Sequence, residues 1–434
     1  MDWLLLDPMD SMTLRLVYCD LDLRLRRGFS SCRVLRQDSL ARARRCRTPA
    51  ALAVALHRLS PWAYVPSVAD NGVQKQHRCQ IRGFHVTSAL RRLGHPHPHT
   101  VPLPYKERHV VVTTCGDLYK KWRTEGRVGY KHAPDEGAVV PLTYVHTGMD
   151  RTEHKERGER PLVLLLTGSP GQYQDFSYTI PFLDRHGADV VCFNWPNFTF
   201  TRQTGYWWHS SEEKAHLVID FLKKLDIKEV DMLVSHSSGA YPAVQLAAEQ
   251  PGVYVKSLAL LMPTTGTDVR AIRTSLLYNK VANWMLRSMY ALPLLTSIVN
   301  WTMLLGGHPI KRNMDDVFFA YLSTAGVTDA RYDRQLTMLC ERGVPMVVMI
   351  SDTDKLISPE NYKNFLRRLG HDPERAWFYD GKGNLISRGE PGVVKVIEMT
   401  KGSHYAFSRH SDICNQALLE LLSRAPLYPK RFRV

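Results

Sequence analysis

The residues most suited to chemistry form a tight turn between an apolar run and a helical stretch. The turn is Ser235-His236-Ser237-Ser238-Gly239, which follows the apolar run 232–234. A serine on so strained a turn is exposed above the sheet edge and can act as a nucleophile, provided that the residues two before and two after it are small. Ser235 and Gly239 satisfy this around Ser237, whereas centring the motif on Ser238 puts His236 at a small position. Ser237 is the predicted nucleophile; alternatively, Ser235 merely caps the helix.

Two later loops contain the groups that would activate this serine. Asp354 lies in the turn 351–359, and His404 lies in the loop 401–407. An imidazole titrates near neutral pH, so it can take the serine proton, and a carboxylate fixes its tautomer and stabilises the imidazolium. The alternatives are Asp352 as the acid and His236 or His410 as the base.

A regular alternation of strands and helices must position these loops. Several of the apolar runs are continuous rather than alternating, as expected for parallel strands covered on both faces. The expected strands are 109–113, 139–145, 161–166, 189–193, 230–234, 255–261, 345–350 and 393–399. The expected helices are 172–185, 210–225, 240–249, 359–369 and 412–424. This order predicts a three-layer α/β fold with its ligand site at the carboxyl ends of the strands.

These motifs and their order resemble the α/β-hydrolase superfamily, in its serine-nucleophile branch, over residues 105–430. That family places its nucleophile after the fifth strand, its acid after the seventh and its histidine after the eighth. Thr167-Gly-Ser-Pro-Gly171 together with the Ser237 turn is also similar to a nematode-restricted group of uncharacterised α/β-hydrolases. The resemblance implies an eight-stranded, mostly parallel sheet in a domain 105–434, with a helical cap at about 266–340.

The resemblance also implies an oxyanion hole and narrows the reaction. Its donors would be the backbone N–H groups of Ser238 and Ser169, the latter in a loop similar to the family's His-Gly-x-Pro loop, with Thr167 replacing the histidine. A serine nucleophile argues against dehalogenase and epoxide hydrolase chemistry, because those relatives use an aspartate. We therefore expect a serine hydrolase acting on an ester through a Ser237, His404 and Asp354 triad and an acyl-enzyme, without a cofactor or a metal. The alternative is a catalytically inactive binding protein of the same fold.

The segment between the sixth and seventh strands is unusually apolar. Residues 284–307 contain one charged residue, Arg287, which with Pro293 and Asn300 interrupts any membrane span. We expect a lid that lines an apolar acyl pocket or rests on a membrane surface; the alternative is ordinary packing within the cap. An apolar ester, such as a lipid, is the expected small-molecule substrate, and lipid metabolism the expected context.

The first 104 residues are expected to be a basic, disordered extension or transit segment. Residues 1–100 carry 15 Arg and one Lys against seven Asp, and no glutamate precedes Glu107. Arg82, Phe84 and Thr87 resemble the end of a mitochondrial presequence, although the early aspartates depart from that pattern. The expected location is mitochondrial, or else cytoplasmic; an Arg-rich leader without an address is the alternative.

Charge and cysteine content exclude other classes of protein. Outside the extension the chain is only mildly basic and has no Lys/Arg stripe interleaved with aromatic residues, so nucleic-acid binding is not expected. The eight cysteines form no Cys-x-x-Cys pair, which favours a reducing compartment and argues against a zinc site.

Overall fold

The computed structural model describes residues 103–424 with several gaps. The gaps are 128, 151–159, 267–280, 283, 287, 289–290, 306–313, 326–328 and 391. The predicted extension, except for its last two residues, and the motif that resembles a presequence therefore lie outside the described residues.

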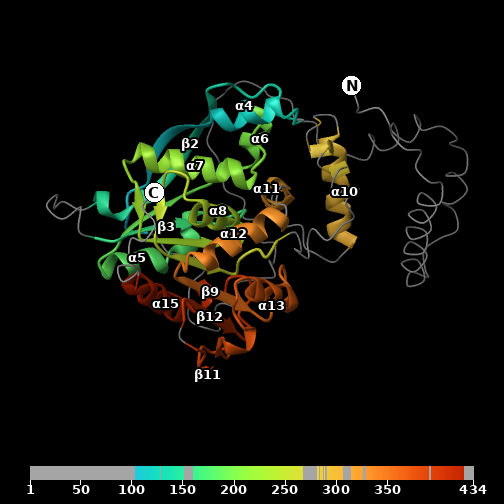
Figure 1. The fold of residues 1–434 in the computed structure, drawn as a ribbon. Helices are drawn as coiled ribbons and strands as arrows, with labels where there is room; N and C mark the ends of the chain where they lie inside the picture. The colour runs from blue at the N-terminus through green and yellow to red at the C-terminus, as the bar shows by residue number, and fades with distance from the viewer. Residues whose placement is uncertain are drawn as a thin grey trace, which may run out of the picture. The chain divides into compact units, whose positions relative to one another are not determined.

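A single large sheet organises the described residues (Figure 1). Its ten strands lie in the order β1-β2-β4-β3-β6-β8-β9-β12-β10-β11. Strand β1 pairs antiparallel with β2, and β2 with β4; from β4 to β10 every neighbouring pair is parallel, and β11 closes the edge antiparallel to β10. The strands are β1 (Arg108–Cys115), β2 (Gly137–His146), β3 (Leu162–Leu166), β4 (Asp189–Phe193), β6 (Met232–His236), β8 (Leu258–Leu261), β9 (Met346–Ser351), β10 (Trp377–Tyr379), β11 (Leu385–Ser387) and β12 (Val394–Met399).

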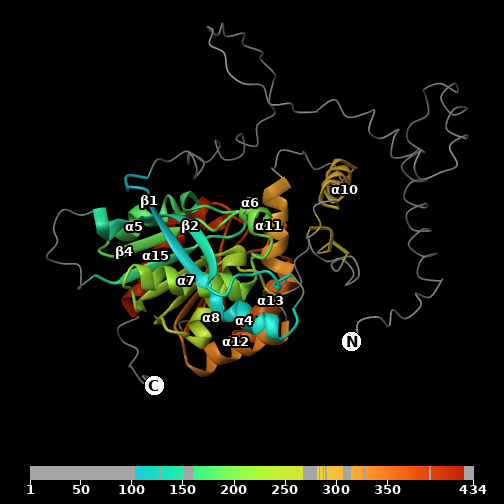
Figure 2. The same cartoon turned by 90° about the horizontal axis from the view of Figure 1, so that it is seen from above.

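Helices cover both faces of this sheet, because its parallel strands are apolar on both sides. In β3, Leu164 and Leu166 join one buried cluster, and Val163 and Leu165 join another. Figure 2 shows α7, α8 and α12 on one side of the sheet and α5 and α15 on the other. The helices are α4 (Gly116–Thr124), α5 (Thr179–Arg185), α6 (Phe198–Thr204), α7 (Ser211–Lys224), α8 (Ala240–Glu249), α10 (Leu292–Leu305), α11 (Met314–Ala325), α12 (Asp329–Glu341), α13 (Pro359–Arg368), α14 (Ala406–Arg409) and α15 (Ser411–Arg424).

The three-layer α/β fold predicted from the sequence is confirmed, and the sheet is larger than predicted. All eight expected strands are present, but β10 and β11 add two strands at one edge. Each has three residues, and those of β11 are all exposed, so neither contains a hydrophobic period that the sequence could reveal.

Two of the expected strands are each interrupted. Residues 230–234 divide between β5 (Glu229–Val230) and β6, and residues 255–261 between β7 (Tyr254–Val255) and β8. The short pieces β5 and β7 pair with each other in a separate sheet. At the break in the first, the side chain of Asp231 accepts a hydrogen bond from Leu162 N (2.7 Å) and one from Lys256 Nζ (2.6 Å).

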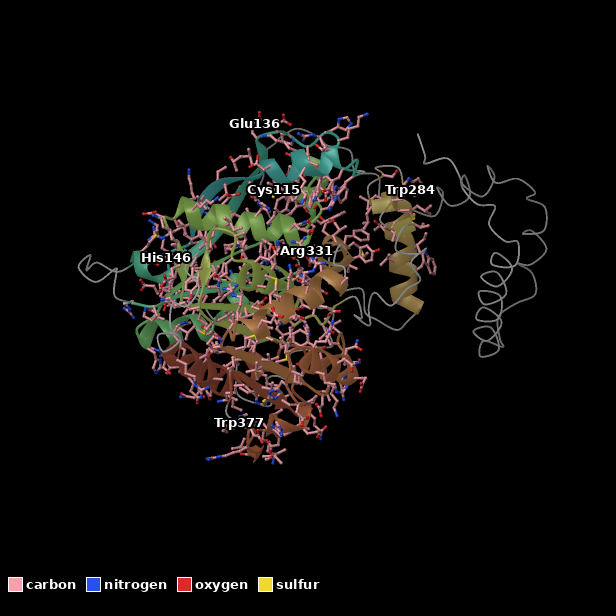
Figure 3. All side chains as sticks on the ribbon, viewed as in Figure 1. Cys115, Glu136, His146, Trp284, Arg331 and Trp377 are labelled. Carbon is pink, nitrogen blue, oxygen red and sulfur yellow. The ribbon has the colours of Figure 1, made fainter. Side chains whose placement is uncertain are left out.

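The region expected to form the cap contains α10, α11 and α12, which differ in their surroundings. Helix α12 packs on α8, and Arg331 of α12, labelled in Figure 3, pairs with Glu212 of α7 and with Glu249 of α8. In α10, by contrast, the side chains of Leu294 and Trp301 are 59% and 64% exposed. No helix that the structure describes is both long and apolar enough to cross a membrane.

Candidate active site

The nucleophile turn forms where β6 ends and α8 begins. Ser237 starts the short helical segment η6 (Ser237–Gly239) and has φ = 52°, in the left-handed region that residues with a side chain rarely adopt. Gly239 allows the turn to lie against the end of β3, since a Cβ on it would stand 2.6 Å from the Thr167 carbonyl oxygen. The backbone strain and the close contact are those expected of a nucleophile elbow.

Ser235, the residue that stands where a glycine is usual, fits inside this turn. Its side chain is fully buried, and its hydroxyl has no hydrogen-bond partner among the described residues. The extra side chain is therefore accommodated in the packing between β6 and its neighbours, without a compensating hydrogen bond.

The structure brings the three predicted triad residues together. His404 Nε2 lies 2.8 Å from the Ser237 hydroxyl oxygen, and His404 Nδ1 lies 2.7 Å from Asp354 Oδ2. Ser237 is 9% exposed, and the His404 side chain is 11% exposed. Acid and base follow the neighbouring strands β9 and β12, so one sheet edge positions both.

Asp354 is held as a carboxylate by several donors. Its Oδ1 accepts the backbone N–H groups of Leu356 (2.8 Å) and Ile357 (3.2 Å), and its Oδ2 also accepts the Tyr362 hydroxyl (2.6 Å). Burial opposes its ionisation, but the hydrogen bonds and the charge of His404 keep the pKa of Asp354 below its ordinary value. Asp352, the alternative acid, instead accepts the backbone N–H of Lys401 (2.7 Å).

His236, an alternative base, packs against His404, and His404 rather than His236 has a ring nitrogen hydrogen-bonded to the Ser237 hydroxyl. Its ring packs against the rings of His404, Tyr405 and Phe407, with centroids 4.7–5.0 Å apart. Burial, with the neighbouring charge of His404, lowers the pKa of His236 to about 4. The neutral ring therefore donates from Nε2 to the His404 carbonyl oxygen (3.1 Å), which supports the base loop. His410, the other alternative base, lines a separate pocket together with Gly381, Lys382 and Gly383.

The two predicted oxyanion donors flank Ser237. Gly168 lets the loop after β3 approach, because a Cβ on it would stand 2.9 Å from the Ser237 Cβ. The Ser169–Pro170 peptide bond is cis, and the Ser169 N–H has no acceptor among the described residues. Ser238 is in the first turn of η6, where N–H groups lack a partner within the helix. Both groups are thus available to a ligand.

A buried lysine near this loop was not predicted from the sequence. Lys214, in the first turn of α7, donates from Nζ to the hydroxyl oxygens of Ser169 (3.0 Å) and Ser323 (2.8 Å). Its side chain is 1% exposed, and burial lowers the pKa of Lys214 to about 7. The one signal for it in the sequence is its position on the apolar face of α7, between Ser210 and Leu217, where a lysine is unexpected.

Tyr362 is a second residue near the triad that the sequence analysis did not identify. It lies on α13, eight residues after Asp354, with its ring fully buried. Burial, followed by the charge of Asp354, raises the pKa of the Tyr362 hydroxyl well above its ordinary value, so the hydroxyl remains a donor to the carboxylate. No sequence motif marks it, since a tyrosine on a helix face is more often a core residue.

Metal ligands are not grouped in the described parts of 103–424, where no cluster of three or more His, Cys, Asp or Glu side chains could hold a metal ion. Cys115, Cys192, Cys340 and Cys414 are free thiols, in keeping with the absence of a paired-cysteine motif in the sequence. The expectation that the reaction needs no cofactor stays a prediction.

Comparison with known proteins finds one matching family model and one weak relative. Residues 128–306 match the model of a family described as alpha/beta hydrolase of unknown function (DUF1057). The match covers less than half of the chain; it includes the predicted nucleophile and oxyanion loop and ends before Asp354. An uncharacterized protein of Caenorhabditis elegans is 27% identical over 88 residues, which are 20% of this chain and 25% of that protein. The match thus spans only a quarter of that relative's length.

Solved structures with a similar fold include several enzymes. A thermophilic esterase from Thermogutta terrifontis is 13% identical, with a TM-score of 0.44 over 73% of this chain and 99% of its own. An enol-lactonase from Burkholderia xenovorans LB400 is 12% identical, with a TM-score of 0.41 over 65% of this chain and 96% of its own. A haloalkane dehalogenase loop variant from Bradyrhizobium elkanii is 17% identical, with a TM-score of 0.40 over 67% and 96%.

The strand order and the matching family model agree on the fold of the chain. A mostly parallel sheet with an antiparallel start and helices on both faces carries a strained serine turn after β6, an acidic turn after β9 and a histidine loop after β12. The family model that matches the central part of the chain describes the same fold. The described residues thus have an α/β-hydrolase fold, and residues 128–306 match the model of a family with that description.

Proposed function

We propose that the protein is a serine hydrolase that cleaves an ester through Ser237, His404 and Asp354. The observation that carries this proposal is the continuous hydrogen-bonded line from the Ser237 hydroxyl through both ring nitrogens of His404 to Asp354. The strained φ of Ser237 and the unengaged N–H of Ser169 support it.

In the proposed mechanism, His404 takes the Ser237 proton as the serine oxygen attacks the carbonyl carbon of the ester. Asp354 accepts the hydrogen bond from Nδ1 and stabilises the imidazolium that forms. The N–H groups of Ser169 and Ser238 bind the oxyanion, and His404 then gives its proton to the departing alkoxide. A water molecule, activated by the same histidine, hydrolyses the acyl-enzyme and restores Ser237.

Labelling by a fluorophosphonate probe tests the nucleophile directly. The wild-type protein should be labelled at one site, and Ser237→Ala should abolish labelling, because the serine oxygen forms the bond to phosphorus. Intact-mass spectrometry and peptide mapping measure both results.

Ser235→Ala is the matched control, since it removes a serine hydroxyl from the same turn that lies outside the proposed machinery. It should be labelled like the wild type. A folded wild-type protein that resists the probe would instead favour the alternative function, a catalytically inactive α/β-hydrolase fold that binds a ligand.

An apolar acyl ester is the proposed substrate class. Helices α10 and α11 follow β8 in the place of a cap, and α10 contains no charged residue. Hydrolysis of p-nitrophenyl esters from acetate to palmitate should show kcat/KM rising with chain length beyond acetate. A profile that falls steadily from acetate would contradict the apolar substrate.

The exposed apolar side chains near and on α10 favour a peripheral contact with a membrane surface. Trp284, Leu294 and Trp301 are each more than half exposed, and tryptophan is suited to the boundary between acyl chains and headgroups. Sedimentation with phosphatidylcholine vesicles should deplete the wild type more than a Trp284→Ser/Trp301→Ser double variant. Equal depletion of the two proteins would contradict the contact.

Import into mitochondria, where the extension would act as a transit segment, is the proposed localisation. N-terminal sequencing of the protein from isolated mitochondria should give a start between Ser88 and Leu93, just after the motif that resembles a presequence. A chain in the cytosol that starts at Met1 would contradict this.

A further inference from the structure

Lys214 occupies a position that connects three parts of the molecule. It extends from the first turn of α7 to Ser169 in the loop after β3 and to Ser323 on α11. Its Nζ lies 5.1 Å from the ring centroids of both Trp195 and Phe319. Because Ser323 donates its own hydroxyl proton to the Phe319 carbonyl oxygen (2.8 Å), its oxygen can only accept from the lysine.

A positive charge at this position is energetically unfavourable. The amino end of a helix disfavours cations, and a lysine is almost never fully buried without an ionised partner. Within the part of the chain that the structure describes, the polar partners of the Lys214 ammonium are the two hydroxyls, and it makes no ion pair with a carboxylate. A residue placed at such cost is a candidate for function.

The carboxylate of Glu213, the residue before Lys214, is hydrogen-bonded to other groups. Glu213 accepts hydrogen bonds from the Tyr119 hydroxyl, the Trp208 N–H and the Ser210 N–H and hydroxyl, at 2.9–3.2 Å. Burial raises the pKa of Glu213 to about 7. In its charged form Glu213 raises the pKa of Lys214, an effect smaller than that of burial. The other titratable group near the lysine is His209, which is buried and bonded to Thr201 and Trp207.

We propose that Lys214 is a positioning residue for the oxyanion loop, and that its ammonium both fixes Ser169 against α11 and adds positive charge to the oxyanion site. This inference rests on the proposed function, because Ser169 supplies one of the two oxyanion donors there. The ammonium contacts the side chain of the residue whose backbone N–H would bind the oxyanion. Its charge, surrounded by protein rather than water, acts there with little screening.

The rate of fluorophosphonate labelling measures this role without knowledge of the substrate. Attack by Ser237 on phosphorus develops negative charge in the oxyanion hole, so the second-order rate constant reports on it. Lys214→Met should lower that constant by about 10–100-fold at pH 6.5, somewhat less than the loss of a direct oxyanion donor. Lys224→Met, an exposed lysine at the end of the same helix, should label at the wild-type rate.

A double-mutant cycle tests whether the lysine acts through Ser169. Ser169→Ala keeps the backbone N–H but removes the oxygen that Lys214 holds. If the lysine acts through that oxygen, Lys214→Met/Ser169→Ala should label within about twofold of the slower single variant. Effects that multiply would overturn the positioning role.

Stability and pH separate this role from a structural one. Removing a costly buried charge among aromatic rings should leave the Tm of Lys214→Met unchanged or raise it, whereas a structural lysine would lower it. The ratio of wild-type to variant labelling rates should be greatest below pH 7 and shrink above pH 8, because burial brings the pKa of Lys214 to about 7.

The labelling experiments distinguish failure of this inference from failure of the proposed function. If Lys214→Met is labelled at the wild-type rate at pH 6.5, the inference is wrong while the proposed function stands. If the wild-type protein itself is not labelled, the proposed function fails and this inference fails with it.

Discussion

Two buried ionisable groups lie near the candidate active site, Asp354 bonded to His404 and Lys214 bonded to Ser169, and their surroundings are opposite. Asp354 has four hydrogen-bond donors, and its negative charge is stabilised there. Lys214 has two neutral hydroxyls as acceptors, and its positive charge is destabilised. The hydrogen bonds of the Asp354 carboxylate are all made without a substrate. Near Lys214, by contrast, several buried polar groups have no hydrogen-bond partner among the described residues.

The unengaged groups include the side chains that surround the oxyanion loop and the elbow. In the described part of the chain, the hydroxyls of Thr167, Ser235 and Ser238 are buried without a hydrogen-bond partner. The comparison teaches that the carboxylate side is fully hydrogen-bonded by the fold, while on the other side the backbone N–H groups of Ser169 and Ser238 are left for what binds there. The four predictions below test this difference.

The largest effect should come from Asp354→Asn. The amide cannot accept from Nδ1 as a carboxylate does, so His404 loses both its tautomer and its stabilised charge, and kcat/KM for a p-nitrophenyl ester should fall about 10³–10⁴-fold. Asp352→Asn, two residues away, should stay within about threefold of the wild type. Similar losses of kcat/KM in the two variants would contradict the assignment of Asp354 as the partner of His404.

The second largest effect is expected from Gly239→Ala. Its Cβ would stand 2.6 Å from the Thr167 carbonyl oxygen, so the elbow and the oxyanion loop must separate, at a cost of about 2 kcal/mol or more in the free energy of unfolding. Urea denaturation measures the loss. Gly392→Ala, where the nearest atom would lie 3.7 Å away, is the control and should change stability by no more than about 0.5 kcal/mol.

A smaller effect is expected from Tyr362→Phe, which removes one donor from the Asp354 carboxylate. The pKa of Asp354 lies below its ordinary value in the folded protein, so its stabilisation is present above the ordinary value and is lost as pH falls through the folded one. The variant should raise that pKa, so that the acid-induced loss of stability begins at higher pH, and it should lower the maximal kcat/KM about tenfold. Urea denaturation across the acidic pH range measures the first effect; Tyr144→Phe, on β2, should leave that pH dependence in place, and movement in both variants would contradict the assignment.

The smallest effect should distinguish two buried threonines. The Thr167 hydroxyl has no partner among the described residues, so Thr167→Val should leave the free energy of unfolding within about 0.5 kcal/mol of the wild type or raise it. The Thr147 hydroxyl accepts from Val190 N (3.0 Å), and Thr147→Val should lose about 1–2 kcal/mol. Equal losses would mean that Thr167 is as fully bonded as Thr147.

The sequence predicted those parts of the molecule that depend on local pattern. Ser237 is marked by the small residues around it. Asp354 follows the continuous apolar run of the buried strand β9, and His404 follows the mostly apolar, partly buried strand β12. Their mutual distances could not be predicted, because they depend on strand order: β12 lies beside β9 although the β10 and β11 segments come between them in the chain.

Lys214 and Tyr362 could not be identified from the sequence, for a different reason. Each is an ordinary helix residue whose role depends on what another element places opposite it, Ser323 for the first and Asp354 for the second. Such pairings are separated by 109 and eight residues and carry no motif. They become visible only once the helices are packed on the sheet.

The close approach of Gly239 to β3 has a consequence for how this protein could change its substrate. The elbow and the oxyanion loop meet backbone to backbone, and the Thr167 carbonyl is further anchored by Trp195 Nε1 (2.9 Å). The spacing of the two proposed oxyanion donors is therefore set by backbone contacts that include no side chain of α10. Under the proposed function, substitutions in α10 can alter selectivity while the reacting geometry is inherited unchanged, whereas Ser323 of α11 is bonded to Lys214 and through it to Ser169.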